Sequence, residues 1–247
     1  MEQQEVSIEK EAHTLLSQGQ NEQARKLFKK AAIAFSQSGN HRQAALMFAS
    51  AASVWGKVYS DKSFYAAAQL YEEAAKEAVK YHDFDYATLM YKYAAIDYER
   101  DGEYEKFSNC FYNTKDCARK QLFSSLFQGR GGPGYRIKKF ITGCALEISC
   151  LIWGYGERPL RTFVTGVTMV LGCAFLFMHT GLAQGGTRYN PSFIDALYFS
   201  VATITTLGSA DIAPYGISRH IALTEAFFGI FIISLYFISL SRKYLRI

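Results

Sequence analysis

The sequence predicts an all-α protein, in which an antiparallel helical solenoid precedes two membrane-spanning helices that flank a short re-entrant helix. An alanine–aromatic–alanine pattern recurs along the first half of the chain. Two long apolar runs lie in the second half, and a shorter apolar segment separates them. We therefore expect a helical-repeat domain over residues 1–128, a basic linker with an interfacial amphipathic helix over 129–160, and a two-helix membrane domain over 161–247.

The composition excludes several classes of protein. Of the 247 residues, 49% are hydrophobic and 15% aromatic, and only four are proline, which argues against a disordered chain. The five cysteines form no CxxC pair, so a secreted disulfide framework is not expected. Residues 1–128 carry 16 basic and 17 acidic residues, whereas residues 129–247 carry 11 basic and 5 acidic ones. The basic excess lies beside the apolar runs and indicates lipid headgroups as partners, and not nucleic acid.

The recurring motif of the first half has spacings of four and three residues, which place its members on one stripe of a helix. The small alanines let neighbouring helices approach closely, while the ring fills the space between them. One such helix cannot bury its stripe alone, so consecutive antiparallel helices are expected to stack. The motifs are Ala24–Phe28–Ala31, Ala44–Phe48–Ala51, Ala67–Tyr71–Ala74 and Ala87–Tyr91–Ala94, with a weaker copy at Phe107–Phe111–Thr114.

Helix-breaking residues separate these motifs at Gly19, Gly39–Asn40, 56–61, Asp83 and Asp101–Gly102. The motif resembles the second helix of tetratricopeptide repeats. The long Tyr- and Ala-rich helices over residues 8–125 are more similar to the soluble NSF attachment protein family. The resemblance implies a solenoid that binds an unidentified protein or peptide. Further tyrosines are either part of a binding face or ordinary surface residues; they are Tyr65, Tyr86, Tyr93, Tyr98 and Tyr104.

The two apolar runs cover residues 162–182 and 221–241, and each is long enough to cross a hydrocarbon core of about 30 Å. Arg158 and Arg161 precede the first run, and a basic cluster follows the second. By the positive-inside rule, both termini are expected in the cytoplasm and the connection 183–220 outside.

The connection contains an apolar segment, residues 192–204, that is too short to cross the bilayer but has the length of a re-entrant helix. The small and polar residues 205–211 follow directly. Irregular backbone at membrane depth is stable only where it contacts protein or water, so this stretch is expected to line an aqueous pore.

Residues 196–208, together with Asp211 and Pro214, resemble the pore helix and selectivity filter of potassium channels. The frame of two helices, with Glu225 and Gly229 in the second, is similar to the small bacterial two-transmembrane group over residues 160–247. The resemblance implies a homotetramer that conducts potassium or another monovalent cation and needs no cofactor or other metal. It assigns the filter to Thr206, Leu207, Gly208, Ser209 and Ala210, the pore mouth to Asp211, and the pore helix to Tyr198, Phe199, Thr203 and Thr205. The coordinating oxygens are the Thr206 hydroxyl and the carbonyls of residues 206–209.

The filter departs from the family pattern at two positions. Ser209 replaces an aromatic ring, and Ala210 replaces a glycine that adopts a left-handed or otherwise glycine-favoured backbone in the family. Alanine in that conformation is expected to cost about 1–2 kcal/mol per subunit. Both changes predict a filter that is looser, wider at its outer end or collapsed, and cation conduction with weak selectivity for potassium.

Outside the filter, Glu225 is an acid within an apolar span and therefore a functional candidate. It is alternatively a structural residue that reaches water or accepts a hydrogen bond from a neighbour. Apolar side chains of residues 137–152 follow one stripe beside Arg136, Lys138 and Lys139, which suits either a membrane surface or a protein contact.

Motifs for phosphate loops, zinc proteases and serine hydrolases are absent from the sequence, so we expect no enzyme. The leading hypothesis is a tetrameric cation channel regulated through its cytoplasmic repeat domain. The alternative is a membrane-anchored scaffold whose pore module does not conduct. A soluble trafficking adaptor is inconsistent with the two apolar runs.

Overall fold

The structure is a computed structural model, which describes residues 2–58, 64–127 and 132–245. The described residues form ten α-helices, one short 3₁₀ helix and a small three-stranded sheet, so the predicted all-α class is confirmed. Contacts divide the chain into two compact units, residues 1–148 and 149–246, and the boundary falls within α7.

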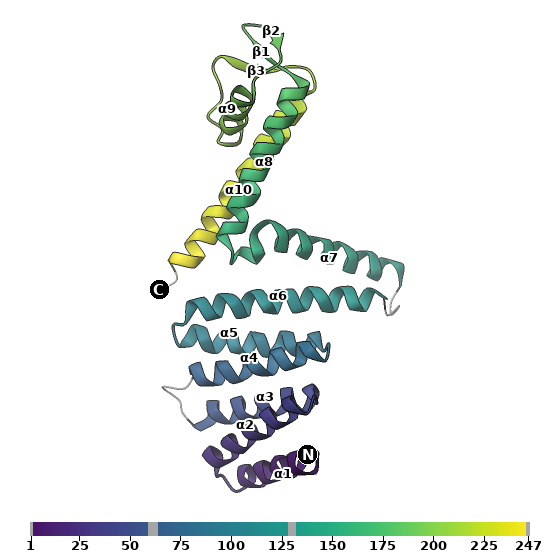
Figure 1. The fold of residues 1–247 in the computed structure, drawn as a ribbon, viewed down its shortest axis with the longest axis vertical. Coiled ribbons are helices and arrows are strands. Elements are labelled where there is room, and N and C mark those ends of the chain that lie inside the picture. Colours follow the sequence, from purple (N-terminus) through teal and green to yellow (C-terminus); the bar gives the residue numbers. More distant parts are fainter. Residues whose placement is uncertain (1, 59–63, 128–131, 246–247) are drawn as a thin grey trace. The chain divides into compact units, whose positions relative to one another are not determined.

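The amino-terminal unit contains an antiparallel stack of α1 to α6, in which α1 to α5 each pack against the next helix in the chain. Figure 1 shows this stack in the order of the sequence, from purple to teal. The helices are α1 (Glu2–Ser17), α2 (Asn21–Gln37), α3 (His41–Val58), α4 (Phe64–Lys80), α5 (Phe84–Arg100) and α6 (Tyr104–Phe127).

The alanine–aromatic–alanine stripe forms the core of this stack, as the spacing predicts. Ala24, Phe28 and Ala31 are fully buried, and the corresponding residues of α3 and α5 are nearly so. Tyr71 and Phe111 are only half-buried, and Tyr71 packs against the ring of Tyr93, with 5.4 Å between the ring centroids. Small residues therefore bring the helix backbones together and rings fill the remaining space.

Four of the turns share one geometry. After α2, for example, the N–H of Asn40 donates to the carbonyl of Phe35 at 2.9 Å, and Gly39 has a φ of 83°. This is the hydrogen-bond pattern of a Schellman cap. Gly19 and Gly102 occupy the same position, and His82 takes it between α4 and α5 with a φ of 66°. The predicted break at residues 56–61 is wrong at its start, because α3 continues through Gly56; residues 59–61 lie outside the described part.

The helix predicted within the basic linker is α7 (Pro133–Trp153). Arg119 of α6 forms an ion pair with Glu147, and the Nζ of Lys139 donates to the Oγ of Ser125 at 2.9 Å. These contacts attach α7 to α6. Its apolar side chains at Ile137, Phe140, Ile141 and Ile148 are nevertheless more than half exposed.

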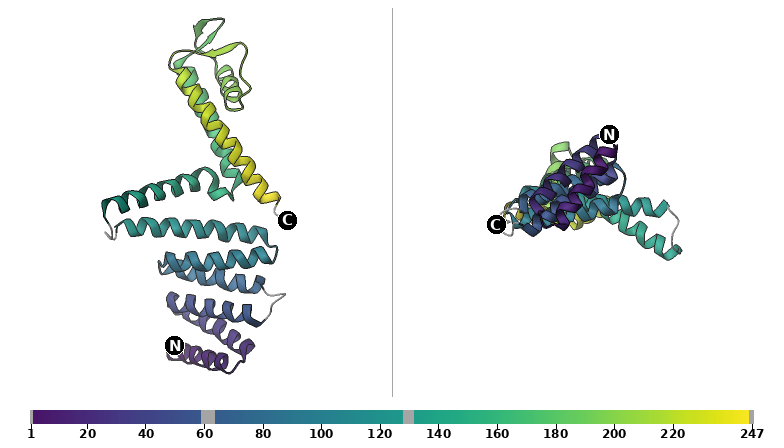
Figure 2. Two further views of the ribbon diagram at one scale, coloured as in Figure 1. Left: turned by 180° about the vertical axis from the view of Figure 1, so that it is seen from behind. Right: turned by 90° about the horizontal axis from the view of Figure 1, so that it is seen from below.

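The carboxy-terminal unit contains η1 (Gly154–Gly156), α8 (Pro159–Thr180), α9 (Phe193–Ile204) and α10 (Ser218–Tyr244). The long helices α8 and α10 lie side by side and antiparallel, and α9 packs against both near one end (Figures 1 and 2). Within the described residues, α8 and α10 are long and apolar enough to cross a membrane. Only 17% of the most apolar window of each is buried, unlike the core helix of a soluble protein.

A small antiparallel sheet closes the end of this unit where α8 and α10 are connected. It consists of β1 (Leu182–Gln184), β2 (Thr187–Tyr189) and β3 (Ile212–Pro214), in the order β2-β1-β3. Leu182 pairs with both Tyr189 and Pro214. The sequence analysis did not predict this sheet, because strands of three residues show too little alternation to be recognised.

Candidate functional site

The helix α9 is held at both ends and along one side. At its start the Oγ of Ser192 accepts a hydrogen bond from the N–H of Asp195 at 3.2 Å, which caps the helix. Phe199 is buried and packs edge-to-face on Phe177 of α8, with 4.9 Å between the ring centroids. The opposite side leaves Tyr198 exposed to 56%.

The residues predicted as a filter, 206–210, lie in one irregular stretch after α9, residues 205–211, termed the filter segment below. Thr205, which was predicted in the pore helix, lies just outside α9, because the helix ends at Ile204. The Oγ1 of Thr205 donates to the carbonyl of Val201 at 2.6 Å. The N–H of Gly208 donates to the carbonyl of Ala202 at 3.2 Å. The filter segment is therefore anchored on the last turn of α9, which includes the predicted pore-helix residue Thr203.

The backbone of the filter segment is left-handed at two positions, Thr206 with a φ of 60° and Gly208 with a φ of 72°. Ala210 is not among the described residues with positive φ. The strain that the sequence analysis expected at Ala210 if it kept the family's conformation is absent. A left-handed backbone occurs instead at Thr206, where it costs about 1–2 kcal/mol. The structure holds this strain immediately after α9.

Most side chains of the filter segment are exposed. Leu207 is 81% exposed, and Ala210 and Asp211 are also open. Ser209 is half-buried, because its Oγ donates to the carbonyl of Ile212 at 2.5 Å, at the start of β3. The site residues predicted over 198–211 thus form one continuous helix and loop beside α8 and α10.

The remaining predicted residue, Glu225, lies in α10 and is fully buried. Its Oε1 contacts the hydroxyl of Ser200, a buried residue of α9 that the sequence analysis did not identify. One turn later, Gly229 lies directly against Ile204, the last residue of α9. The only feature of the sequence that could have indicated Ser200 is that its side chain is polar within the apolar segment 192–204.

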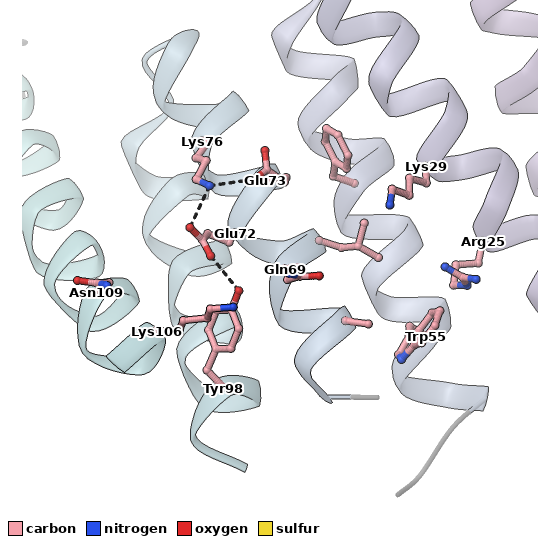
Figure 3. Close-up of a pocket in the computed structure, with 13 residues that line it drawn as sticks. Arg25, Lys29, Trp55, Gln69, Glu72, Glu73, Lys76, Tyr98, Lys106 and Asn109 are labelled. Carbon is pink, nitrogen blue, oxygen red and sulfur yellow. Dashed lines mark hydrogen bonds and ion pairs between the residues drawn. The ribbon is translucent and has the colours of Figure 1, made fainter. Parts of the chain in front are cut away.

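The amino-terminal unit contains a groove of about 710 Å³, formed by α2 to α6 and shown in Figure 3. Lys76 lies 2.9 Å from both Glu72 and Glu73, and the hydroxyl of Tyr98 donates to Glu72 at 2.9 Å. Burial, together with this hydrogen bond, raises the pKa of Tyr98 well above its ordinary value. Thus Tyr98, one of the additional tyrosines, forms part of the groove floor and is not a surface residue.

Basic side chains line the groove on both sides of this cluster. The guanidinium of Arg25 lies 3.9 Å from the ring centroid of Trp55, which is a cation–π contact. Lys29 lies on the same side, and Lys106 lies near Tyr98 (Figure 3). Among the described residues, no group of three or more His, Cys, Asp or Glu side chains is placed to hold a metal ion.

Comparison with known proteins identifies the carboxy-terminal unit only. A family model described as an ion channel matches residues 163–246. No curated protein and no solved structure matches the chain. The match covers α9, the filter segment, α10 and nearly all of α8. Together with the two apolar helices, it supports an ion-channel domain of a membrane protein in this part of the chain.

Proposed function

We propose that four copies of this chain form a cation channel of the potassium type, regulated by a protein or peptide bound to the helices α1 to α6. One observation carries the proposal. Within the matched range, the irregular filter segment follows a short helix that is held between two antiparallel membrane helices. In the proposed channel this polar stretch lies at membrane depth, where irregular backbone is stable only if it contacts protein or lines a water-filled pore.

Ion coordination in the proposed channel depends on backbone oxygens. The carbonyls of Thr206, Leu207, Gly208 and Ser209, with the Thr206 hydroxyl, replace the hydration shell of a monovalent cation. One chain supplies too few oxygens for this, so four filter segments surround the ion path. Asp211, at the end of the segment, raises the local concentration of cations at the pore mouth.

The exposed apolar surface of this unit supports assembly. Ile194, Tyr198 and Val201 form one stripe on α9, and each is at least 43% exposed. Phe227 and Phe231 are similarly exposed on α10. Contact with a neighbouring subunit would bury this apolar surface, so we place the subunit contacts along this stripe.

The charges at the helix ends support an orientation. Arg158 and Arg161 lie at the start of α8, and Arg242 and Lys243 lie in the last turn of α10. Because η1 contacts α10, these basic ends lie on one side of the membrane. By the positive-inside rule that side is the cytoplasm, which also places α1 to α7 there.

Regulation is assigned to the groove of the amino-terminal unit. Its size and its mixture of charged and aromatic side chains suit a peptide segment. Such a ligand shifts the balance between open and closed channels only if it binds the two states with different affinity.

The experiment is cation flux into liposomes that contain the purified full chain, together with the particle size in detergent. We expect a tetramer and a flux that is lost in Gly208→Ala, because Gly208 has a left-handed backbone and alanine is strained there. The size of the variant particle is the control for assembly. A monomeric particle, or no flux under any lipid or voltage condition, contradicts the proposal.

A membrane-anchored scaffold is the second candidate. The observation in its favour is the hydrogen bond from Ser209 to Ile212, which ties the filter segment to β3 where the family has an aromatic residue. If the assembled protein does not conduct but still binds a partner through the groove, the scaffold is the function.

A further inference from the structure

A cluster of polar groups connects the three helices of the membrane domain away from the ion path. Glu225 of α10 and Ser200 of α9 are both fully buried. The Ser200 hydroxyl lies 3.0 Å from the carbonyl oxygen of Val170 in α8 and also contacts the Oε1 of Glu225. Cys173, on α8, is a further neighbour of the same carboxyl group. The buried cluster therefore consists of Val170, Cys173, Ser200 and Glu225.

Counting hydrogens assigns the donors in the buried cluster. A serine hydroxyl carries one hydrogen, whereas a backbone carbonyl oxygen only accepts. If Ser200 donates to Val170, the contact between Ser200 and Glu225 needs a hydrogen from the carboxyl group. Both contacts are satisfied only when Glu225 is a neutral carboxylic acid that donates to Ser200. Its other oxygen, Oε2, is buried and has no hydrogen-bond partner among the described residues, which also favours the neutral form.

A second contact lies one helical turn further along the same two helices. A Cβ atom at Gly229 would lie 3.1 Å from the carbonyl oxygen of Ile204 and 3.2 Å from its Cα. Glu225 and Gly229 are four residues apart, as are Ser200 and Ile204, so each pair lies on one face of its helix. The two contacts form a seam between α9 and α10.

The seam ends where the filter segment begins. Ile204 is the last residue of α9, and the filter segment is anchored on the turn that contains it. The N–H of Thr206 donates to the carbonyl of Thr203 at 3.1 Å, and that of Gly208 donates to Ala202. Any shift of α9 along α10 therefore moves the backbone carbonyls of the filter segment by the same amount.

We propose that Glu225 is a positioning residue for ion conduction, which holds α9 at a fixed depth between α8 and α10 as a neutral hydrogen-bond donor to Ser200. This rests on the proposed channel function. The carboxyl group acts through its shape and its hydrogen, and not through a negative charge. It follows that an uncharged side chain of the same length can replace it, whereas a shorter acid cannot.

The test compares Glu225→Gln with Glu225→Asp in the full chain. The glutamine keeps the length and offers an N–H to Ser200, whereas the aspartate keeps the acid but is one methylene too short. In liposomes, Glu225→Gln is expected to retain the wild-type ratio of potassium to sodium permeability, and Glu225→Asp to change it. Ser234→Ala is the matched control, because Ser234 is a polar residue on an exposed part of α10. Wild-type behaviour of Glu225→Asp, or loss of conduction in an assembled Glu225→Gln, overturns the proposal.

Two readouts do not depend on conduction. The infrared absorption of a protonated carboxyl group is expected in the wild type and is missing in Glu225→Gln. Amide hydrogen exchange in α9 is expected to be about tenfold faster in Ser200→Ala, and unchanged in Ser234→Ala, because a buried hydrogen bond is lost only in the first. If the wild type does not conduct, the channel function fails, while these two measurements still decide the role of Glu225. Absence of the carboxyl band in the wild type contradicts that role.

Discussion

Arg242, in the last turn of α10, forms an ion pair with Glu157, in the turn before α8, with 4.0 Å between Nη1 and Oε1. The side chain of Glu157 is only 2% exposed, and that of Arg242 is 46% exposed. Gly156, which precedes Glu157, has a φ of 86°, and a Cβ there would lie 3.0 Å from Nη1 of Arg242. The end of α10 thus rests on the segment that connects α7 to α8.

Removing this ion pair is expected to loosen the end of α10. In Glu157→Gln, amide exchange over residues 240–245 is expected to be about threefold faster, a modest factor because Arg242 is partly in water. The double variant Glu157→Arg with Arg242→Glu is expected to restore the wild-type rate. Glu147→Gln, which removes an acid of α7 bonded to Arg119, is the control. If exchange in this part of α10 is unchanged in Glu157→Gln, the ion pair does not hold the helix end.

Gly229→Ala is expected to displace α9. Its Cβ would lie 2.5 Å from Cγ1 of Ile204 and close to the Ile204 backbone, so α9 must move or the variant must lose about 1–3 kcal/mol of stability. The measurement is cation flux together with the thermal stability of the assembled particle. Gly172→Ala is the matched control, because nothing lies within 4 Å of a Cβ at this position of α8. Equal behaviour of the two variants contradicts the close contact.

Two substitutions in the filter segment are expected to increase the selectivity for potassium over sodium. Ser209→Tyr combined with Ala210→Gly restores the residues of the family pattern and removes the hydrogen bond from Ser209 to Ile212. We expect a higher ratio of potassium to sodium permeability, measured from reversal potentials in bilayers. The single variant Ala210→Gly is the control, since it adds flexibility without the aromatic ring. An unchanged ratio in the double variant argues against the placement of the filter at residues 206–210.

Acid is expected to destabilise the amino-terminal unit through Glu77. Burial by itself raises the pKa of Glu77, but hydrogen bonds from Lys80, His41 and Ser36 outweigh it, and the pKa in the folded protein lies below 4.5. The stabilisation is therefore complete above about pH 4.5 and is lost as the pH falls through the lowered value. The measurement is amide exchange in α4 at pH values on both sides of 4.5, corrected for the intrinsic exchange rate. It gives the slope of stability against pH. Glu77→Gln is expected to flatten this slope, and an unchanged slope contradicts the assignment.

The turn between α4 and α5 offers a stabilising substitution. His82 has a left-handed backbone, which is unfavourable for any residue with a Cβ. His82→Gly is expected to stabilise the amino-terminal unit by about 0.5–1 kcal/mol, after the greater freedom of glycine in the unfolded chain is included. Urea-dependent amide exchange of α4 and α5 measures this. The control is Gly39→Ala, at the equivalent turn after α2, which is expected to destabilise the unit. If His82→Gly also destabilises it, the prediction is contradicted.

Much of the architecture follows from local patterns. The period of Ala24, Phe28 and Ala31 predicts a buried helical stripe, and the same spacing in the later copies predicts the stack. Ser192 marks the start of α9 because its side chain caps the helix. Each of these features depends on residues within one or two helical turns of each other, and such interactions are visible in the order of residues.

The contacts that position the filter segment depend on residues far apart in the chain. Ser200 and Glu225 are 25 residues apart, and Glu157 and Arg242 are much further apart. Whether such side chains meet depends on the rotation and depth of each helix relative to the others, which no local period encodes. The same holds for β3, whose pairing with β1 joins two ends of a long connection.

The order of residues by itself determined the class of the protein: a stack of amphipathic helices, two apolar spans, and between them a short helix with a polar segment after it. These depend on hydrophobic period and length, which are properties of a segment alone. Only the tertiary structure decided which groups hold that segment. It paired Glu225 with Ser200 and brought Gly229 against Ile204, because packing between helices selects one register among many that the same pattern allows. It also placed left-handed backbone at Thr206 and Gly208, and not at Ala210.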